Sequence, residues 1–189
     1  KSELNIDEER ISLMMGSNCH VVIYPVNRNK DLNLVCIIRD KKYDPDNIYK
    51  LVGEIVSQNN IFEKVLIGDL KSWPLYFTPK ILPSTNSKVF YIGDAFNGFL
   101  PTLAQGAGQS IESAYELFNL IKENKTNIHN TYFQTRLKRA KIVRKRSNFN
   151  FFVFHFSSTF MQSIRNFFIK FLVKRKRFIN SYLGTVYKN

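Results

Sequence analysis

The sequence contains little cysteine and tryptophan. It has 2 cysteines and 1 tryptophan in 189 residues, and Cys19 and Cys36 lack the spacing of a metal site. Because each lies in a different predicted strand, they indicate buried thiols in a reducing compartment rather than a disulfide scaffold. No signal peptide is present, so the sequence predicts a cytoplasmic protein.

Several catalytic patterns are also missing. None of the 8 glycines falls in the G-x-G-x-x-G turn of a dinucleotide-binding βαβ unit. No Ser-His-Asp set, metal-ligand cluster or pair of carboxylates can be identified. The sequence therefore predicts no catalytic side chain and no metal, and any reaction would depend on a bound cofactor.

Acidic residues are absent from Asn124 to Asn189, where fifteen Lys and Arg residues lie. The whole chain has 28 basic and 15 acidic residues, so the remainder has 13 basic and 15 acidic ones, a net charge of −2. The formal charge of +13 thus arises in the C-terminal segment. This segment suits an anionic membrane surface, a nucleic acid or simply a solvated helical tail. Because no nucleic-acid motif accompanies the charge, we expect no nucleic-acid partner and keep peripheral membrane contact as the functional alternative.

A long uninterrupted apolar run is missing too. The Phe-rich residues 149–173 have the length of a membrane span, but they include His155, Arg165 and Lys170. Charged groups are costly inside a bilayer, so we expect no span here.

The most informative stretch is residues 88–123. Its apolar run Val89–Ile92 predicts a buried strand that ends at Gly93 and is followed at once by Asp94. A loop containing Pro101 comes next, and small residues then precede a predicted helix. The small residues are Gly106, Ala107 and Gly108, and the helix has Ile111, Ala114, Tyr115, Phe118 and Ile121 at helical spacing.

This arrangement favours a bound cofactor. An aspartate after a strand accepts hydrogen bonds from sugar-like hydroxyls, and small residues at a helix start let a planar anionic group approach the backbone N–H groups. Glycine and aspartate are equally typical of ordinary turns, so the residue types alone are consistent with either a cofactor site or a plain turn.

The order of residues within this stretch adds a resemblance. Gly93-Asp94-Ala95, Pro101, Gly106-Ala107-Gly108-Gln109 and Ile111-Glu112-Ser113-Ala114 resemble the second FAD-binding motif of the class A flavoprotein monooxygenases, most closely the salicylate-hydroxylase-like branch. The resemblance extends from about Gly16 to the end of the chain. It implies a mixed α/β fold, namely the C-terminal part of a p-hydroxybenzoate-hydroxylase-like FAD-binding fold, with the N-terminal βαβ unit outside this sequence.

The resemblance also implies roles. Asp94 would bind a ribityl hydroxyl of FAD, Pro101 would lie beside the flavin ring, and the helix starting at Gly106, Ala107 and Gly108 would point at the ring edge that becomes negative on reduction. The family usually has a small residue and histidine where this chain has Phe96 and Asn97, which puts local packing in question.

The activity implied is hydroxylation of a phenolic or quinone-precursor aromatic ring. NAD(P)H would reduce the FAD, and O2 would form a flavin C4a-hydroperoxide that transfers one oxygen. Two alternatives stay open: an FAD-dependent dehydrogenase or reductase that inserts no oxygen, and a non-enzymatic basic module that binds membrane or nucleic acid.

Three regions follow from the resemblance: 1–79, part of a substrate-domain sheet and a crossover; 80–125, the FAD motif; and 126–189, basic Phe-rich helices. In the first region, Cys19–Val26 and Asn33–Arg39 predict a hairpin, and a helix is expected from Asp44 to Val56 or Ser57. His20 and Tyr24 share a strand face and are candidate substrate contacts.

Two further helices are expected near the C-terminus. Residues 131–147 predict a helix with an apolar side and a solvent-facing Arg/Lys side, and Met161 to Arg177 predict an amphipathic helix. His155 is expected to be a packing residue at a helix end.

Overall fold

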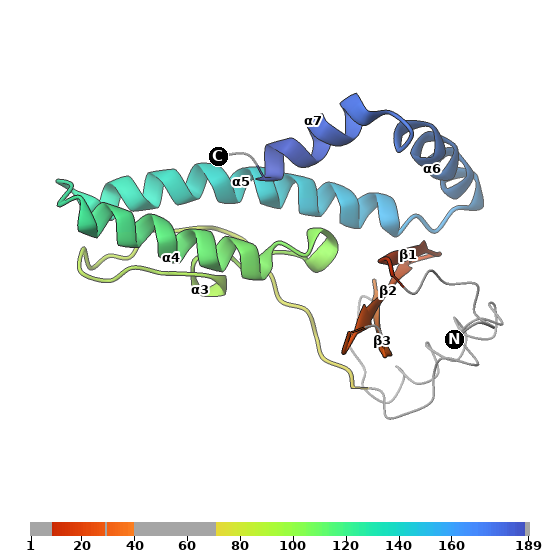
Figure 1. Cartoon of the computed structure of the whole chain (residues 1–189), viewed down its shortest axis with the longest axis horizontal. Coiled ribbons are helices and arrows are strands. Elements are labelled where there is room, and N and C mark those ends of the chain that lie inside the picture. Colours follow the sequence, from red (N-terminus) through yellow and green to blue (C-terminus); the bar gives the residue numbers. More distant parts are fainter. Residues whose placement is uncertain (1–8, 29, 40–70, 188–189) are drawn as a thin grey trace. The chain divides into compact units, whose positions relative to one another are not determined.

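The computed structural model describes residues 9–28, 30–39 and 71–187. The chain divides into two units, which consist of residues 1–74 with 154–159 and of residues 75–153 with 160–189 (Figure 1). The helix expected to begin at Asp44 lies outside the described residues.

The first unit contains a three-stranded antiparallel sheet in the order β1-β2-β3, formed by Ser12–Met15, Cys19–Val26 and Asp31–Ile38. The predicted hairpin is confirmed: Cys19 pairs with Ile38, and Val26 pairs with Asp31. The β-branched and apolar residues of β2 alternate across the sheet, so Val21 and Ile23 are buried on one face. Their neighbours on that face include Met14, Leu34 and Cys36.

The other face of β2 carries a buried histidine pair. His20 is 1% exposed, and its Nδ1 lies 3.1 Å from Nε2 of His155. The His155 Nε2 is also 3.3 Å from the carbonyl oxygen of Ile37. His155 directly follows a helix and is itself buried, which confirms the expected packing role.

The second unit is mainly helical. Two helices run side by side in opposite directions, joined by a short connection, and the last helix lies back along the longer of them (Figure 1). The last helix is fixed by Tyr182, whose hydroxyl donates to Oδ1 of Asn150 and whose ring lies 4.6 Å from the Arg146 guanidinium. The elements are α3 (Asp94–Asn97), the 3-10 helix η2 (Pro101–Leu103), α4 (Gly106–Lys122), α5 (Ile128–Phe154), α6 (Thr159–Leu172) and α7 (Lys176–Tyr187).

Two element predictions need correction. Residues Val89–Ile92 form no strand, and Val89, Tyr91 and Ile92 are exposed. A strand requires a neighbouring strand for its backbone hydrogen bonds, and none pairs with these residues in the part of the chain that the structure describes.

The helix expected over Met161 to Arg177 is in fact two helices. α6 ends at Leu172, where the amide of Arg175 donates to the Leu172 carbonyl at 3.0 Å, and α7 begins at Lys176. Lys174 to Arg177 are four consecutive cations, and like charges on neighbouring turns disfavour a continuous helix. Among the residues with defined positions, no helix has both the length and the apolar character of a membrane span.

Candidate functional site

The turn at Gly93 lies against the start of α4. Gly93 has φ +62° and ψ −137°, and its carbonyl accepts the amides of Phe96 and Asn97, each at 3.0 Å. A Cβ at Gly93 would lie 2.7 Å from Oγ of Ser110. Only glycine fits this backbone and this space, and the turn preceding Asp94 is therefore held beside the first turns of α4.

The first turn of α4 is open on one side. A Cβ at Gly106 would have no other group within 4 Å, whereas one at Gly108 would lie 3.7 Å from Oε1 of Gln105. Gln105, the residue before the helix, makes no capping hydrogen bond with its side chain. The first N–H groups of a helix have no partner within the helix, so this end combines open space with partial positive charge.

Asp94 is exposed and has no hydrogen bond or ion pair to any residue the structure describes. Asp94 directly follows Gly93, and Gly93 lies against Ser110 of α4. The Ser110 hydroxyl donates to the Gly106 carbonyl at 2.9 Å, so Gly93 packs against the first turn of α4, where Gly106 lies. The structure thus brings Gly93, Asp94 and the α4 start into one neighbourhood.

Pro101 is exposed and begins η2. The 3-10 turn is followed by Ala104, which adopts the left-handed conformation with φ +51° and donates its amide to the Pro101 carbonyl at 3.4 Å. This bend leads directly into α4 and fixes the path of the loop between the two predicted flavin-contacting segments.

α5 holds this loop through buried polar side chains. The Ser147 hydroxyl donates to the Leu100 carbonyl, and Oγ1 of Thr102 donates to the Ser147 carbonyl at 2.7 Å. One turn further, Nδ2 of Asn150 donates to the Thr102 carbonyl at 3.3 Å. The residues on both sides of Pro101 are therefore hydrogen-bonded to α5.

The same helix anchors α3. Arg144 donates from Nη2 to Oδ1 of Asn97 and from Nη1 to the Pro79 carbonyl at 3.2 Å. Burial lowers the pKa of Arg144. Asn97 is buried, and its Nδ2 has no hydrogen-bond partner in the described part of the chain. An acceptor from outside these residues would satisfy it.

α5 also binds α4 through a buried arginine. Nη2 of Arg136 donates to Oε1 and to the carbonyl of Gln109 at 2.8 and 3.3 Å, and Nη1 lies 3.4 Å from Oε2 of Glu112. Nε of Arg139 reaches the same carboxylate oxygen at 3.2 Å. Burial alone would raise the pKa of Glu112, but the two arginines outweigh it and the net shift is downward.

Arg136 is an exception to the expectation that the basic side of this helix faces solvent: Lys138, Lys141 and Lys145 are exposed, whereas Arg136 is only 5% exposed. The reason is that the long apolar stem packs in the interior while the guanidinium finds several acceptors on α4. The buried residues of α5 recur every three or four positions: Tyr132, Arg136, Ala140, Val143, Ser147 and Asn150.

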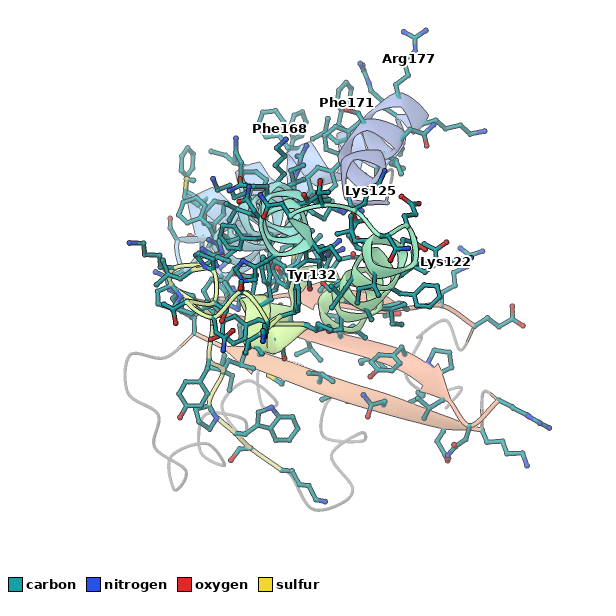
Figure 2. All side chains as sticks on the ribbon, turned by 90° about the vertical axis from the view of Figure 1, so that its left-hand side faces the viewer. Lys122, Lys125, Tyr132, Phe168, Phe171 and Arg177 are labelled. Atoms are coloured by element: carbon teal, nitrogen blue, oxygen red, sulfur yellow. The ribbon has the colours of Figure 1, made fainter. Side chains whose placement is uncertain are left out.

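The aromatic residue at position 96 has a structural explanation. Phe96 is buried, with its ring centroid 6.2 Å from that of Tyr132 and 6.0 Å from that of Phe133. The Tyr132 hydroxyl donates to the Tyr91 carbonyl at 2.8 Å, and burial raises the pKa of Tyr132. Figure 2 shows Tyr132 in the interior of the helical unit. Phe96 therefore anchors α3 by packing its ring against two aromatic residues of α5.

His20 and Tyr24 lie on β2 in the first unit, whereas the loop and α4 belong to the second unit. His20 is buried against His155 and Phe154, with ring centroids 4.8 and 5.3 Å apart. Tyr24 is half-buried on the same strand.

Sequence reasoning missed Arg136, Arg144 and Ser147. A usable signal was present, because Arg136, Ala140, Val143 and Ser147 follow helical spacing, but polar residues in that pattern are normally assigned to solvent.

Comparison with known proteins gives the chain its relatives. Salicylate hydroxylase of Pseudomonas putida is 26% identical over 142 residues, which make up 66% of this chain and 32% of the hydroxylase. A 3-amino-4-hydroxybenzoate 2-monooxygenase of Streptomyces platensis is 25% identical over 168 residues, or 83% of this chain and 42% of the relative. No family model matches.

Among solved structures, a salicylate hydroxylase in complex with its substrate matches with a TM-score of 0.58 and 17% identity, covering 95% of this chain and 50% of that one. The chain thus spans between 32% and 42% of the length of these two curated relatives. It is related, at low identity, to the class A FAD-dependent aromatic monooxygenases, and it has the mixed α/β fold of a salicylate hydroxylase over most of its length.

Proposed function

We propose that this protein is an FAD-dependent monooxygenase that hydroxylates a small phenolic ring, with NAD(P)H as the reductant and O2 as the oxygen source. Its curated relatives are named as hydroxylases of benzoate-type aromatic compounds. When bound, FAD would supply hydride uptake from NAD(P)H and activation of O2, which no side chain supplies here.

One observation carries the proposal: the start of α4 is open at Gly106 and lies beside the turn that presents Asp94. A planar ligand could approach the Gly106 backbone, because no group other than the two neighbouring residues and the backbone of α4 itself lies within 4 Å of the position of a Cβ. The Asp94 carboxylate is exposed and has no partner among the described residues, so it is available to a ligand hydroxyl. These residues therefore fit the flavin and ribityl parts of FAD.

Each residue would bind or orient. Asp94 would accept a hydrogen bond from a ribityl hydroxyl, and Pro101 would lie against the ring. The backbone amides of Gly106, Ala107 and Gly108 would stabilise negative charge on the ring, since a helix N-terminus carries partial positive charge.

α5 would keep these groups in place. Its hydrogen bonds to Leu100, Thr102 and Asn97 are partly buried and hold the loop at three points, and we infer that they preform the site. A preformed site loses less conformational entropy on binding than a mobile loop does.

We keep Tyr24 and His20 as proposed substrate-side residues. Because Nδ1 of His20 is engaged by His155, His20 would act by holding β2 rather than by touching the ring, and Tyr24 is the better candidate for contact. The expected result is that Tyr24→Phe raises KM for the aromatic substrate more than it lowers kcat.

The first test is the visible spectrum of the intact gene product, purified and then mixed with NADH or NADPH in air. An oxidised-flavin spectrum that bleaches and recovers supports the proposal. No flavin, even after addition of FAD, overturns it. Labelled O2 then separates the two flavin enzymes, since a dehydrogenase or reductase would place no labelled oxygen in its product.

Variants test the site itself. Asp94→Ala should lower the flavin content, and Gly106→Val should block the ring while leaving the helical circular dichroism intact. Glu123→Gln is the matched control, since Glu123 is an exposed carboxylate at the opposite end of α4. Equal flavin content in Asp94→Ala and Glu123→Gln would refute the assignment of Asp94.

A further inference from the structure

α6 presents its apolar side outward. Phe160, Ile164, Phe167, Phe168 and Phe171 follow the spacing of one helix face. Phe160 and Phe167 are each 70% exposed, and Phe168 and Phe171 are 54% and 50% exposed. Amphipathic helices of water-soluble domains usually bury this face, whereas the four phenylalanines of α6 face solvent.

The other side of α6 is covered in part: Gln162 and Ile169 are half-buried, Arg165 is buried, and Asn166 is exposed. Arg165 is 4% exposed, with Nη1 donating to the Val153 carbonyl at 3.4 Å and Nε to Oδ1 of Asn166 at 3.0 Å. Burial lowers the pKa of Arg165. Removing this guanidinium from water is costly, and its hydrogen bond to the Val153 carbonyl of α5 holds this side of α6 against α5.

Cations lie at the C-terminal end of the exposed phenylalanine face. Lys170 lies in the last turn of α6, Lys174 to Arg177 follow it, and the Arg175 guanidinium lies 4.2 Å from the Phe171 ring. Figure 2 shows Phe168, Phe171 and Arg177 along one outer edge of the helices. No acidic residue occurs from Asn124 to the end of the chain. We call the α6 face with these flanking cations the Phe/Lys surface.

We propose that the Phe/Lys surface lies on an anionic lipid membrane, with the phenylalanines inserted at the headgroup boundary and the cations among the headgroups. A basic helix with a large aromatic face has the composition of an interfacial helix. A second copy of this chain is a poor occupant, because its own basic segment would meet like charge. This inference is independent of the flavin proposal, because it concerns a different surface and is tested by vesicle binding, which requires no bound flavin.

The test is cosedimentation of the intact protein with two kinds of vesicle, phosphatidylcholine alone and phosphatidylcholine with phosphatidylserine at about 7:3. We expect binding to the mixed vesicles, weakened by high salt, and at least about tenfold weaker binding to the neutral ones. Equal binding to both, or binding to neither, overturns the proposal. Failure to bind vesicles together with capture of a partner protein would also overturn it, because that result assigns the surface to a protein.

Matched variants locate the contact. Phe167→Ser with Phe168→Ser should reduce affinity for the mixed vesicles by about tenfold or more. The control is Phe149→Ser with Phe152→Ser, which removes phenylalanines on α5 that are 56% and 57% exposed. Equal losses in the two double variants would refute a specific role of α6.

A second measurement avoids disruptive substitutions. Trp73 is the chain's one tryptophan, so Phe168→Trp in a Trp73→Phe background places a single fluorescent probe on the surface. Its emission should shift to shorter wavelength when the mixed vesicles are added. An unchanged emission maximum would show that Phe168 stays in water and would contradict the proposal.

Discussion

The buried histidine pair should make the free energy of unfolding decrease as the pH falls from about 7.5 to about 5, a range in which most carboxylates stay ionised. The Ile37 carbonyl can only accept a hydrogen bond, so the nearby Nε2 of His155 carries a proton, and Nδ1 of His20 must be the acceptor of the pair. Protonating His20 at Nδ1 would place two donors face to face. Burial first, and the charge of His155 second, lower the pKa of His20 from 6.5 to about 4.

The sign of the effect follows from this direction. Since the folded pKa lies below the unfolded value, the unfolded chain binds the proton first as pH falls. The stabilisation is complete above the unfolded pKa of 6.5 and is lost progressively toward about 4. For these two values, His20 alone should cost about 2 kcal/mol of unfolding free energy between about pH 7.5 and about pH 5.

The assay is urea unfolding across that pH range for the unmodified protein and three variants. His20→Asn keeps an acceptor near the position of Nδ1 but does not titrate, so its stability should depend much less on pH. His20→Phe should behave similarly, because it removes the titrating ring while Nε2 of His155 still lies 3.3 Å from the Ile37 carbonyl. His129→Gln, in the other unit, is the control and should keep the full slope. An unchanged slope in His20→Asn would refute the reasoning.

Three further outcomes follow from the second unit. Gly93→Ala should lower the free energy of unfolding by about 1–2 kcal/mol in thermal unfolding, because the φ of Gly93 is positive and the added Cβ meets Ser110. Adding Ser110→Ala should recover part of this loss, and a Gly93→Ala variant of unchanged stability would contradict the turn geometry. Arg136→Met should cost about 2–4 kcal/mol in urea unfolding because Gln109 loses its buried donor, and a cost below about 1 kcal/mol would mean that water replaces the guanidinium. Gly106→Ala should leave the melting temperature unchanged or slightly raised, because the Cβ enters open space, while flavin retention falls.

Local sequence patterns predicted part of the fold well. The alternation in Cys19–Val26 and Asn33–Arg39 gave the hairpin, because strand periodicity and turn residues are both encoded over a few positions. The helix following Gly106 was also predicted from spacing, and α4 begins at that residue. These features depend only on near neighbours in the chain, which is why they were accessible without the structure.

The flavin-binding roles of the candidate site residues stay a prediction, and the contacts that hold the loop were not predicted at all. Gly93 and Gly106 were identified from their order in the sequence, and the structure places the turn at Gly93 against the helix that starts at Gly106. The contacts of Arg144 and Ser147 with this loop join positions more than forty residues apart, for which one sequence offers no pairing information.

Burial in this unit follows hydrogen-bond partners as much as it follows side-chain polarity. Tyr115 and Phe118 lie on the apolar stripe of α4 and are exposed, whereas Arg136 and Ser147 are buried because α4 and the loop supply acceptors and donors for them. Helical spacing identifies which residues share a face, and it identified this stripe correctly. It does not state which face is covered, since that depends on whether a complementary surface is present. For the same reason the outward phenylalanines of α6 are informative: on the other side of the helix Arg165 is buried and donates to the Val153 carbonyl of α5, and this contact holds α6 with the phenylalanines exposed.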